Sequence, residues 1–171
     1  MDICISQACQ LDVYTDGQRI QQVYLNLLSN AIKFSPMGGR IMVRAKIGCK
    51  SNLSEKYYFD CRVIDEGPGI HPRDVPRIFD PYLKSKRRGS PQFGRPRHTI
   101  QGNGLGLALC KCVCQNLKGS IMVKDTSNRG TEMEFKIPIK MSQGATSNPL
   151  ANQGNQYLKY LISKSKVMSS E

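Results

Sequence analysis

Four polar residues near the N-terminus recur at helical spacing, and together they could hold a metal ion and a polyanion. Gln22, Asn26, Asn30 and Lys33 are separated by four, four and three positions, which on an α-helix places them within roughly 80° of one another. Two asparagines one turn apart have no explanation in helix propensity. Carbonyl oxygens and an ammonium group on one face suit Mg2+ and the phosphates that it bridges. A solvated helix face is the alternative, which the stripe alone does not exclude.

A second group combines a carboxylate with two glycines. Asp65 follows an apolar alternation and is followed by Gly67 and Gly69. Glycines let another group pack against bare backbone, and a carboxylate accepts a hydrogen bond from an exocyclic amine such as that of adenine. The alternative is an ordinary turn with an exposed acid.

A third group is a run of glycines that precedes a helical pattern. Gly102, Gly104 and Gly106 are placed so that backbone N–H groups and the positive end of a helix dipole can receive phosphate. The same pattern occurs in Rossmann folds, but here the buried strand of a βαβ unit does not precede it.

The apolar pattern predicts the elements that position these groups. We expect short extended segments around Ile3, Ile5 and 11–14, then a helix from Asp16 to about Phe34. Further elements follow in order: a strand at 41–47, a polar loop at 51–56, its antiparallel partner at 57–64, a short helical piece at 76–79, a helix from Gly106 to about Leu117, and strands at 120–124 and 131–139 around a turn at 128–130. This order predicts a two-layer α/β sandwich, with a mixed, mainly antiparallel sheet and helices on one face.

Composition narrows the class of protein. The chain has 171 residues, 39% of them apolar, and a formal charge of +12, which fits one folded domain with a tail. No apolar run is long enough to span a membrane and no secretory signal is visible, so we expect seven reduced cysteines in the cytoplasm. Zinc binding by Cys110, Cys112 and Cys114 is disfavoured, because on a helix the middle thiol points away from the outer two.

The positive charge is concentrated in one segment. Residues 83–101 hold six Lys and Arg residues and no acid, among Gly, Pro and Ser. This composition predicts a mobile loop that faces an anion, either a nucleotide or a nucleic acid. From residue 141 the chain is rich in Ser, Gln and Asn, which is typical of a flexible tail over 141–171.

As an ordered set, these motifs closely resemble the ATP-binding domain of sensor histidine kinases. The N, G1, F and G2 boxes of that family are matched by Asn26-Leu-Leu-Ser-Asn30-Ala-Ile-Lys33-Phe34, Asp65-Glu-Gly67-Pro-Gly69-Ile70, Phe79-Asp-Pro81-Tyr82 and Gly102-Asn-Gly104-Leu105-Gly106-Leu107, and Gly130-Thr131 matches the last small motif. The resemblance covers roughly residues 2–139. It implies the Bergerat fold, with residues 1–140 as the ATP-binding domain and residues 83–101 as its ATP lid.

The resemblance also implies roles for individual residues. Asn26 would be the Mg2+ ligand, with Asn30 and Lys33 reaching the phosphates of ATP, and Asp65 would read the adenine amino group. The remaining expected contacts are Gly67, Gly69 and Ile70 at the adenine, Phe79 as the anchor of the lid, Gly102, Gly104, Leu105, Gly106 and Leu107 at the phosphates, and Thr131.

The residue at one position distinguishes phosphoryl transfer from ATP hydrolysis. Hydrolytic relatives carry a Glu that activates water one turn before the first Asn, and here that position is Gln22, an amide that takes no proton at neutral pH. We therefore expect phosphoryl transfer, with Gln22, Asn26 and Lys33 as the catalytic set. In kinases of this kind the acceptor is a His on a separate dimerisation domain, in a motif where Glu or Asp and then Pro follow the His. Neither His71 nor His98 fits that motif, so the acceptor would be a His on such a separate domain. A receiver domain or response regulator would act downstream.

Alternatives from other classes stay open. A GHKL-type ATPase or a pseudokinase interaction domain would keep the fold and the nucleotide motifs. The charge also suggests a nucleic-acid-binding module, although only Tyr82 and Phe93 flank the basic loop as stacking residues, so nucleic acid is the less favoured partner. We expect no membrane contact from this chain itself, although a parent protein could be anchored.

Overall fold

The computed structural model describes residues 13–51, 54–83 and 103–141. Helix α2 (Gly17–Phe34) begins after Asp16, whose side chain accepts a hydrogen bond of 3.1 Å from the backbone N–H of Arg19. This is an N-cap interaction, which satisfies one of the free N–H groups at the start of a helix. Both predicted ends of this helix are confirmed.

An antiparallel sheet forms the second layer. Its strands are β1 (Val13–Tyr14), β2 (Ile41–Ser51), β3 (Ser54–Asp65), β4 (Ser120–Ser127) and β5 (Gly130–Met141). Strand β3 lies between β2 and β5, and both β1 and β4 pair with the other edge of β5. Every pairing between described strands is antiparallel. The sequence predicted a mixed, mainly antiparallel sheet, and the described strands include no parallel pair.

The sheet differs from the sequence prediction at one hairpin. We expected a loop over residues 51–56, but β2 and β3 continue through most of it, and Ser51 pairs with Ser54. That prediction was wrong because local polarity indicated a loop, whereas a long cross-strand ladder extends the pairing. Strands β4 and β5 also extend beyond 120–124 and 131–139.

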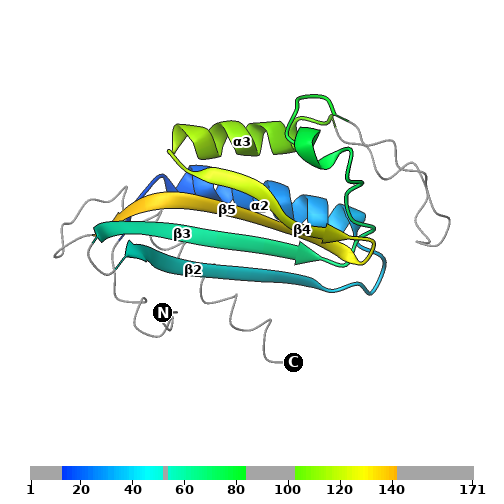
Figure 1. The fold of residues 1–171 in the computed structure, drawn as a ribbon, viewed down its shortest axis with the longest axis horizontal. Coiled ribbons are helices and arrows are strands. Elements are labelled where there is room, and N and C mark those ends of the chain that lie inside the picture. The colour runs from blue at the N-terminus through cyan, green and yellow to red at the C-terminus, as the bar shows by residue number, and fades with distance from the viewer. Residues whose placement is uncertain (1–12, 52–53, 84–102, 142–171) are drawn as a thin grey trace.

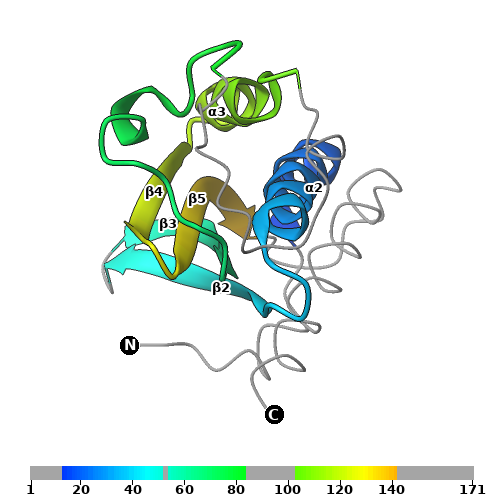
Figure 2. The ribbon, with the colours of Figure 1, turned by 90° about the vertical axis from the view of Figure 1, so that its right-hand side faces the viewer.

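The core lies between the two layers. Alternate residues of β2, β3 and β5 face the helices, and Phe59, Cys61 and Phe135 among them are fully buried. They pack against the apolar side of α2, including Ile20 and Leu27, and against helix α3 (Gly106–Asn116). Figure 2 shows both helices on the same face of the sheet, which confirms the two-layer α/β sandwich with helices on one face.

The opposite face of the sheet carries an ion-pair network. Arg62 bonds Glu134 with a nitrogen–oxygen distance of 2.9 Å and Glu132 at 3.2 Å, and Lys136 bonds Glu134 at 3.1 Å. Glu134 and Asp60 are only 1% and 2% exposed. Because buried carboxylates are costly without partners, these cations stabilise the fold by compensating them.

The remaining expectations have mixed outcomes. The short helical piece expected at 76–79 is a single 3-10 turn, η1 (Val75–Arg77), because Pro76 suits the first turn of a helix but not its continuation. The expectations for 1–12, for residues 84–101 of the lid, for Gly102 and for the tail beyond Met141 lie outside the described residues. Among the described helices, none is long and apolar enough to cross a membrane.

Candidate functional site

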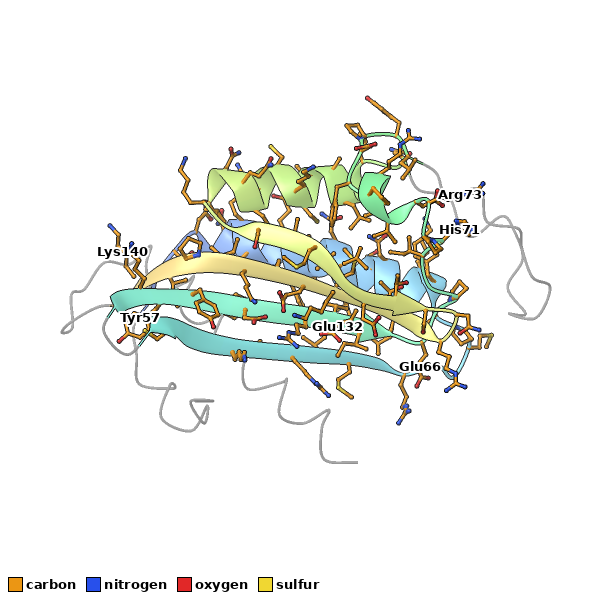
Figure 3. All side chains as sticks on the ribbon, in the orientation of Figure 1. Tyr57, Glu66, His71, Arg73, Glu132 and Lys140 are labelled. Carbon is orange, nitrogen blue, oxygen red and sulfur yellow. The ribbon has the colours of Figure 1, made fainter. Side chains whose placement is uncertain are left out.

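The chain brings several separate segments to one end of the sandwich. The end of β3, the end of α2, η1 and the start of α3 lie together at the right of Figure 1. Glu66, His71 and Arg73 mark this end in Figure 3, whereas Tyr57 and Lys140 mark the opposite end. Most of the predicted site residues that the structure describes lie in these segments or lead into them, whereas Gln22 lies in the first half of α2, Asn26 near its middle and Thr131 at the start of β5.

The polar stripe of α2 borders this region. Gln22, Asn26, Asn30 and Lys33 are all half-buried. The Gln22 Oε1 atom accepts a hydrogen bond of 3.2 Å from Arg19, and the Lys33 Nζ atom lies 5.2 Å from the centroid of the Phe34 ring.

Asn26 faces the start of α3. A Cβ atom placed on Gly106 would lie 3.3 Å from Asn26 Oδ1, so the two residues are in direct proximity although 80 positions separate them. Leu105 precedes the helix, and its own side chain makes no capping hydrogen bond to the N–H groups of the first turn of α3. Those groups and the helix dipole favour an anion beside the Asn26 oxygen.

Asp65 ends β3 on the side that faces the helices. Alternation along the strand puts it on the same face as Cys61 and Val63, both buried in the core. In the sheet Asp65 pairs with Thr131, and Thr131 pairs with Thr126. A polar row therefore closes the end of an otherwise apolar core.

The loop after Asp65 is fixed by close backbone contacts. Asp65 Oδ1 accepts a hydrogen bond of 2.8 Å from the N–H of Gly67, and a Cβ atom on Gly67 would meet the Phe34 carbonyl oxygen at 3.0 Å. Gly69 has a φ of +71°, and a Cβ atom there would lie 1.8 Å from the carbonyl oxygen of Ser127. Glycine is required at this position because a side chain could occupy neither the backbone angle nor the space.

The next residue connects this loop to the polar row. The N–H of Ile70 donates a 2.8 Å hydrogen bond to Thr126 Oγ1, which lies 3.5 Å from Thr131 Oγ1. Thr126 is the site residue that the sequence prediction missed. A β-bulge between Val123 and Asp125 shifts the register of β4 and turns Thr126 towards the helices, and no residue pattern indicated that bulge.

Further contacts lie at the two ends of the segment expected to be a lid. The N–H of Tyr82 donates a 2.9 Å hydrogen bond to the carbonyl of Gly104, and both residues have positive φ angles, +62° and +69°. Phe79 and Leu107 are half-buried and pack against the core, whereas Leu105 is 40% exposed. The residues on either side of the basic segment are thus held together.

The structure therefore joins the predicted residues into two neighbouring clusters. Asn26 with Gly106 forms one, and Asp65 with Gly67, Ile70 and Thr131 forms the other. The contact of Phe34 with Gly67 links α2 to the second cluster. Along α2, Asn26 and Phe34 are eight positions apart, which is about 12 Å of helix.

The three cysteines of α3 do not converge. Cys110 and Cys114 are buried, and Cys112 is exposed on the other side of the helix, as the helical spacing predicted. Burial raises the pKa of the Cys110 and Cys114 thiols to about 12. Among the described residues, no group of three His, Cys, Asp or Glu side chains could hold a metal ion.

Comparisons with known proteins identify the family. Residues 15–141 match the family described as histidine kinase-, DNA gyrase B-, and HSP90-like ATPase. The chain is 33% identical over 159 residues to the autoinducer 2 sensor kinase/phosphatase LuxQ of Vibrio vulnificus, covering 90% of this chain and 17% of that protein. It is 31% identical over 140 residues to the histidine protein kinase DivJ of Caulobacter vibrioides, covering 82% of this chain and 21% of that protein. The chain thus spans about a fifth of the length of these relatives.

Solved structures give the same result. A mycobacterial sensor histidine kinase, MprB, superimposes with a TM-score of 0.58 at 28% identity, covering 77% of this chain and 80% of that one. Full-length ShkA in complex with AMPPNP has a TM-score of 0.54 at 25% identity, covering 74% of this chain and 22% of that one. By its sequence match and by its fold, the chain belongs to the family of histidine kinase-, DNA gyrase B- and HSP90-like ATPases.

Proposed function

We propose that this chain is the ATP-binding catalytic domain of a sensor histidine kinase. It transfers the γ-phosphoryl group of ATP to a His on a separate dimerisation and phosphoacceptor domain. The observation that supports this function best is the pair of clusters along α2, with a carboxylate at the end of the core and Asn26 against the start of α3. The length of α2 between them is comparable with that of an extended nucleoside triphosphate.

The cluster around Asp65 binds the adenine. Asp65 faces the helix layer and accepts a hydrogen bond from the exocyclic amine, while the Gly67 N–H holds the carboxylate in place. Gly69 and Ile70 bring bare backbone and an apolar side chain to the ring, and Thr131 supports Asp65 from the next strand. Thr126 fixes this loop through its hydrogen bond with Ile70.

The cluster of Asn26 and Gly106 binds the phosphates. The N–H groups that begin α3 at Gly106 receive them, with Gly104, Leu105 and Leu107 around that turn. Asn30 and Lys33 reach the same anion from α2. Phe79 packs against the core and anchors the basic lid over residues 83–101.

The donor set fits Mg2+. Asn26 presents a neutral carboxamide oxygen beside Gly106, whose missing side chain leaves the space open, and Mg2+ prefers oxygen ligands with phosphates completing its shell. When bound, the ion would neutralise charge on the transferring phosphoryl group. Asn26 is the residue that would hold it.

The chemistry proposed is transfer, not hydrolysis. Gln22 occupies the place where a general base would stand, and its Oε1 atom accepts a hydrogen bond from Arg19. An amide can orient a group but cannot take a proton. The phosphoryl group therefore passes to an external His, and a response regulator or receiver domain acts after it, in the cytoplasm.

A nucleotide titration tests this function. Calorimetry with Mg2+·AMPPNP is performed on the chain, on Asp65→Asn and on Asp16→Asn as a matched control. Asparagine caps a helix as well as aspartate does, so Asp16→Asn removes one negative charge at the far end of α2 without changing the fold. We expect micromolar binding by the chain and by Asp16→Asn, and at least a tenfold loss in Asp65→Asn, because a charged hydrogen bond contributes about 1.5–3 kcal/mol. No binding by the folded chain would refute the proposal.

A further inference from the structure

Glu66 directly follows Asp65, and both of its carboxylate oxygens bind Arg40. The Oε2 atom accepts a hydrogen bond of 2.9 Å from the backbone N–H of Arg40. The Oε1 atom accepts a second hydrogen bond, of 3.0 Å, from Nε, and it also lies 3.0 Å from a terminal nitrogen of the guanidinium group. Figure 3 labels Glu66 at the end of the sandwich that holds the candidate site. One side chain thus binds both the backbone and the side chain of Arg40.

These contacts lie where the pairing of β2 with β3 ends. The last paired residues are Ile41 and Asp65, and the next pair in that register would be Arg40 with Glu66. Strand β3 ends at Asp65, however, and the Glu66 side chain accepts the hydrogen bond from the Arg40 N–H. That N–H group is satisfied by a side chain and not by a further rung of the ladder, so the main chain can turn towards the helices directly after Asp65.

Backbone from two other elements crowds the same stretch of chain. A Cβ atom on Gly130, which begins β5, would lie 1.9 Å from the Asp65 carbonyl oxygen and 3.3 Å from the Glu66 Cα atom. A Cβ atom on Gly67 would meet the carbonyl oxygen of Phe34, the last residue of α2, at 3.0 Å. Strand β5 and helix α2 therefore limit where this stretch can lie, and the ion pair attaches it to the start of β2.

The orientation of the Asp65 carboxylate depends on this stretch. Its Oδ1 atom accepts a hydrogen bond of 2.8 Å from the N–H of Gly67, and the peptide that supplies this N–H joins Gly67 to Glu66. A displacement of Glu66 therefore moves the donor that orients the carboxylate. Because hydrogen bonds weaken with poor distance and angle, a displaced carboxylate would bind an exocyclic amine less well.

We propose that Glu66 is a positioning residue for adenine recognition: by binding Arg40 it fixes the peptide that precedes Gly67, and this peptide orients the Asp65 carboxylate. Glu66 acts through Asp65 and needs no contact with the nucleotide. The inference rests on the proposed function, in which Asp65 binds the adenine amino group.

Three variants separate the contributions of the two partners. Arg40→Ala removes the bonds of the guanidinium group but keeps the backbone N–H, whereas Glu66→Ala removes all of these bonds. In the double variant the loss of the Arg40 side chain should add nothing, because its partner is already absent. Arg77→Ala is the matched control, since it removes an exposed arginine from another ion pair, of 3.3 Å, with Asp80.

The first readout uses two ligands that each carry one part of the nucleotide. NMR titrations with adenosine test the adenine site, and titrations with Mg2+ and inorganic tripolyphosphate test the phosphate site. Adenosine is uncharged, so the altered charge of a variant does not by itself change the adenosine Kd. Physiological salt limits the effect of that charge on tripolyphosphate, because it screens exposed charges beyond about 8 Å.

We expect Glu66→Ala to raise the Kd for adenosine about fivefold and Arg40→Ala about threefold, the effects of losing a partly exposed hydrogen bond and an exposed ion pair. The double variant should match Glu66→Ala and not reach the roughly fifteenfold loss to which independent effects would multiply. All variants should bind tripolyphosphate within twofold of the unmodified chain, and Arg77→Ala should bind both ligands within twofold. An unchanged adenosine Kd in Glu66→Ala, an equal loss for tripolyphosphate, or a further loss in the double variant would overturn the inference.

The second readout needs no ligand. Hydrogen exchange of the Gly67 amide should be faster in Glu66→Ala than in the unmodified chain and unchanged in Arg77→Ala, because the bond from Gly67 to Asp65 is no longer held in place. Equal protection of this amide in Glu66→Ala would overturn the inference. If the unmodified chain binds neither adenosine nor AMPPNP, the proposed function fails, while the exchange of Gly67 still decides whether Glu66 fixes this loop.

Discussion

Replacing Gly69 by alanine tests how tightly the adenine loop is packed against the β4–β5 turn. Gly69 and Gly38 both have φ angles in the left-handed region, +71° and +77°. The space around them differs: a Cβ atom on Gly38 meets nothing within 4 Å, whereas on Gly69 it meets the Ser127 carbonyl oxygen at 1.8 Å. Gly38→Ala is thus a control for backbone strain alone.

The expected magnitudes follow from this difference. The left-handed conformation costs an alanine about 1–2 kcal/mol, and the lower entropy of the unfolded chain offsets about 0.4–1 kcal/mol, so Gly38→Ala should lower the free energy of unfolding by about 1 kcal/mol. Gly69→Ala must also move backbone and break the hydrogen bond between Ile70 and Thr126, which adds about 1 kcal/mol for the bond and more for the clash. We expect a total of about 3 kcal/mol or more.

Urea unfolding measures both losses, and nucleotide titration follows the same variants. Gly38→Ala should bind Mg2+·AMPPNP like the unmodified chain, whereas Gly69→Ala should bind it at least tenfold more weakly. If the two variants lost the same free energy of unfolding, the close packing of the loop on Ser127 would be refuted.

Three other predictions concern the rest of the described fold. Arg62→Met leaves two buried carboxylates without their main cation, and should lower the free energy of unfolding measured in urea by about 3 kcal/mol; a neutral effect would contradict the role assigned to the network. Hydrogen bonds from the Arg40 backbone and side chain lower the pKa of Glu66, so its stabilisation should be complete above the ordinary glutamate pKa and vanish as the pH falls through the lowered value. An NMR titration of Glu66 checks this, and Arg40→Ala should bring its pKa closer to normal; an unchanged pKa would count against the contact. In the native chain iodoacetamide should label the exposed Cys112 and spare the buried Cys61, and peptide mass mapping that found equal labelling would contradict the placement of the core.

The spacing of apolar residues predicted the helices and strands in which that spacing is regular. The three- and four-residue spacing of apolar residues predicted the helix that ends at Phe34, and the same helical geometry correctly turned Cys112 away from Cys110 and Cys114. Alternation predicted the strand at 41–47, and the strand at 57–64 was predicted as its antiparallel partner, which placed the carboxylate of Asp65 at the end of that strand.

Other features depend on contacts that no local pattern encodes. The β4 bulge brings Thr126 beside Thr131 without a glycine to signal it. Helical spacing placed Asn26 on a polar face, but its approach to Gly106 arises from the packing of α2 on α3. This approach could not be predicted from two positions so far apart in the sequence.

One experiment addresses the central claim, that a nucleotide binds between the end of β3 and the start of α3. Amide spectra of the 15N-labelled chain are recorded with and without Mg2+·AMPPNP. The account predicts that the largest shifts lie at Gly67, Gly69 and Gly106 and at the side chain of Asn26. Shifts centred instead on Arg62 and Lys136, on the opposite face of the sheet, or a spectrum that does not change would contradict it.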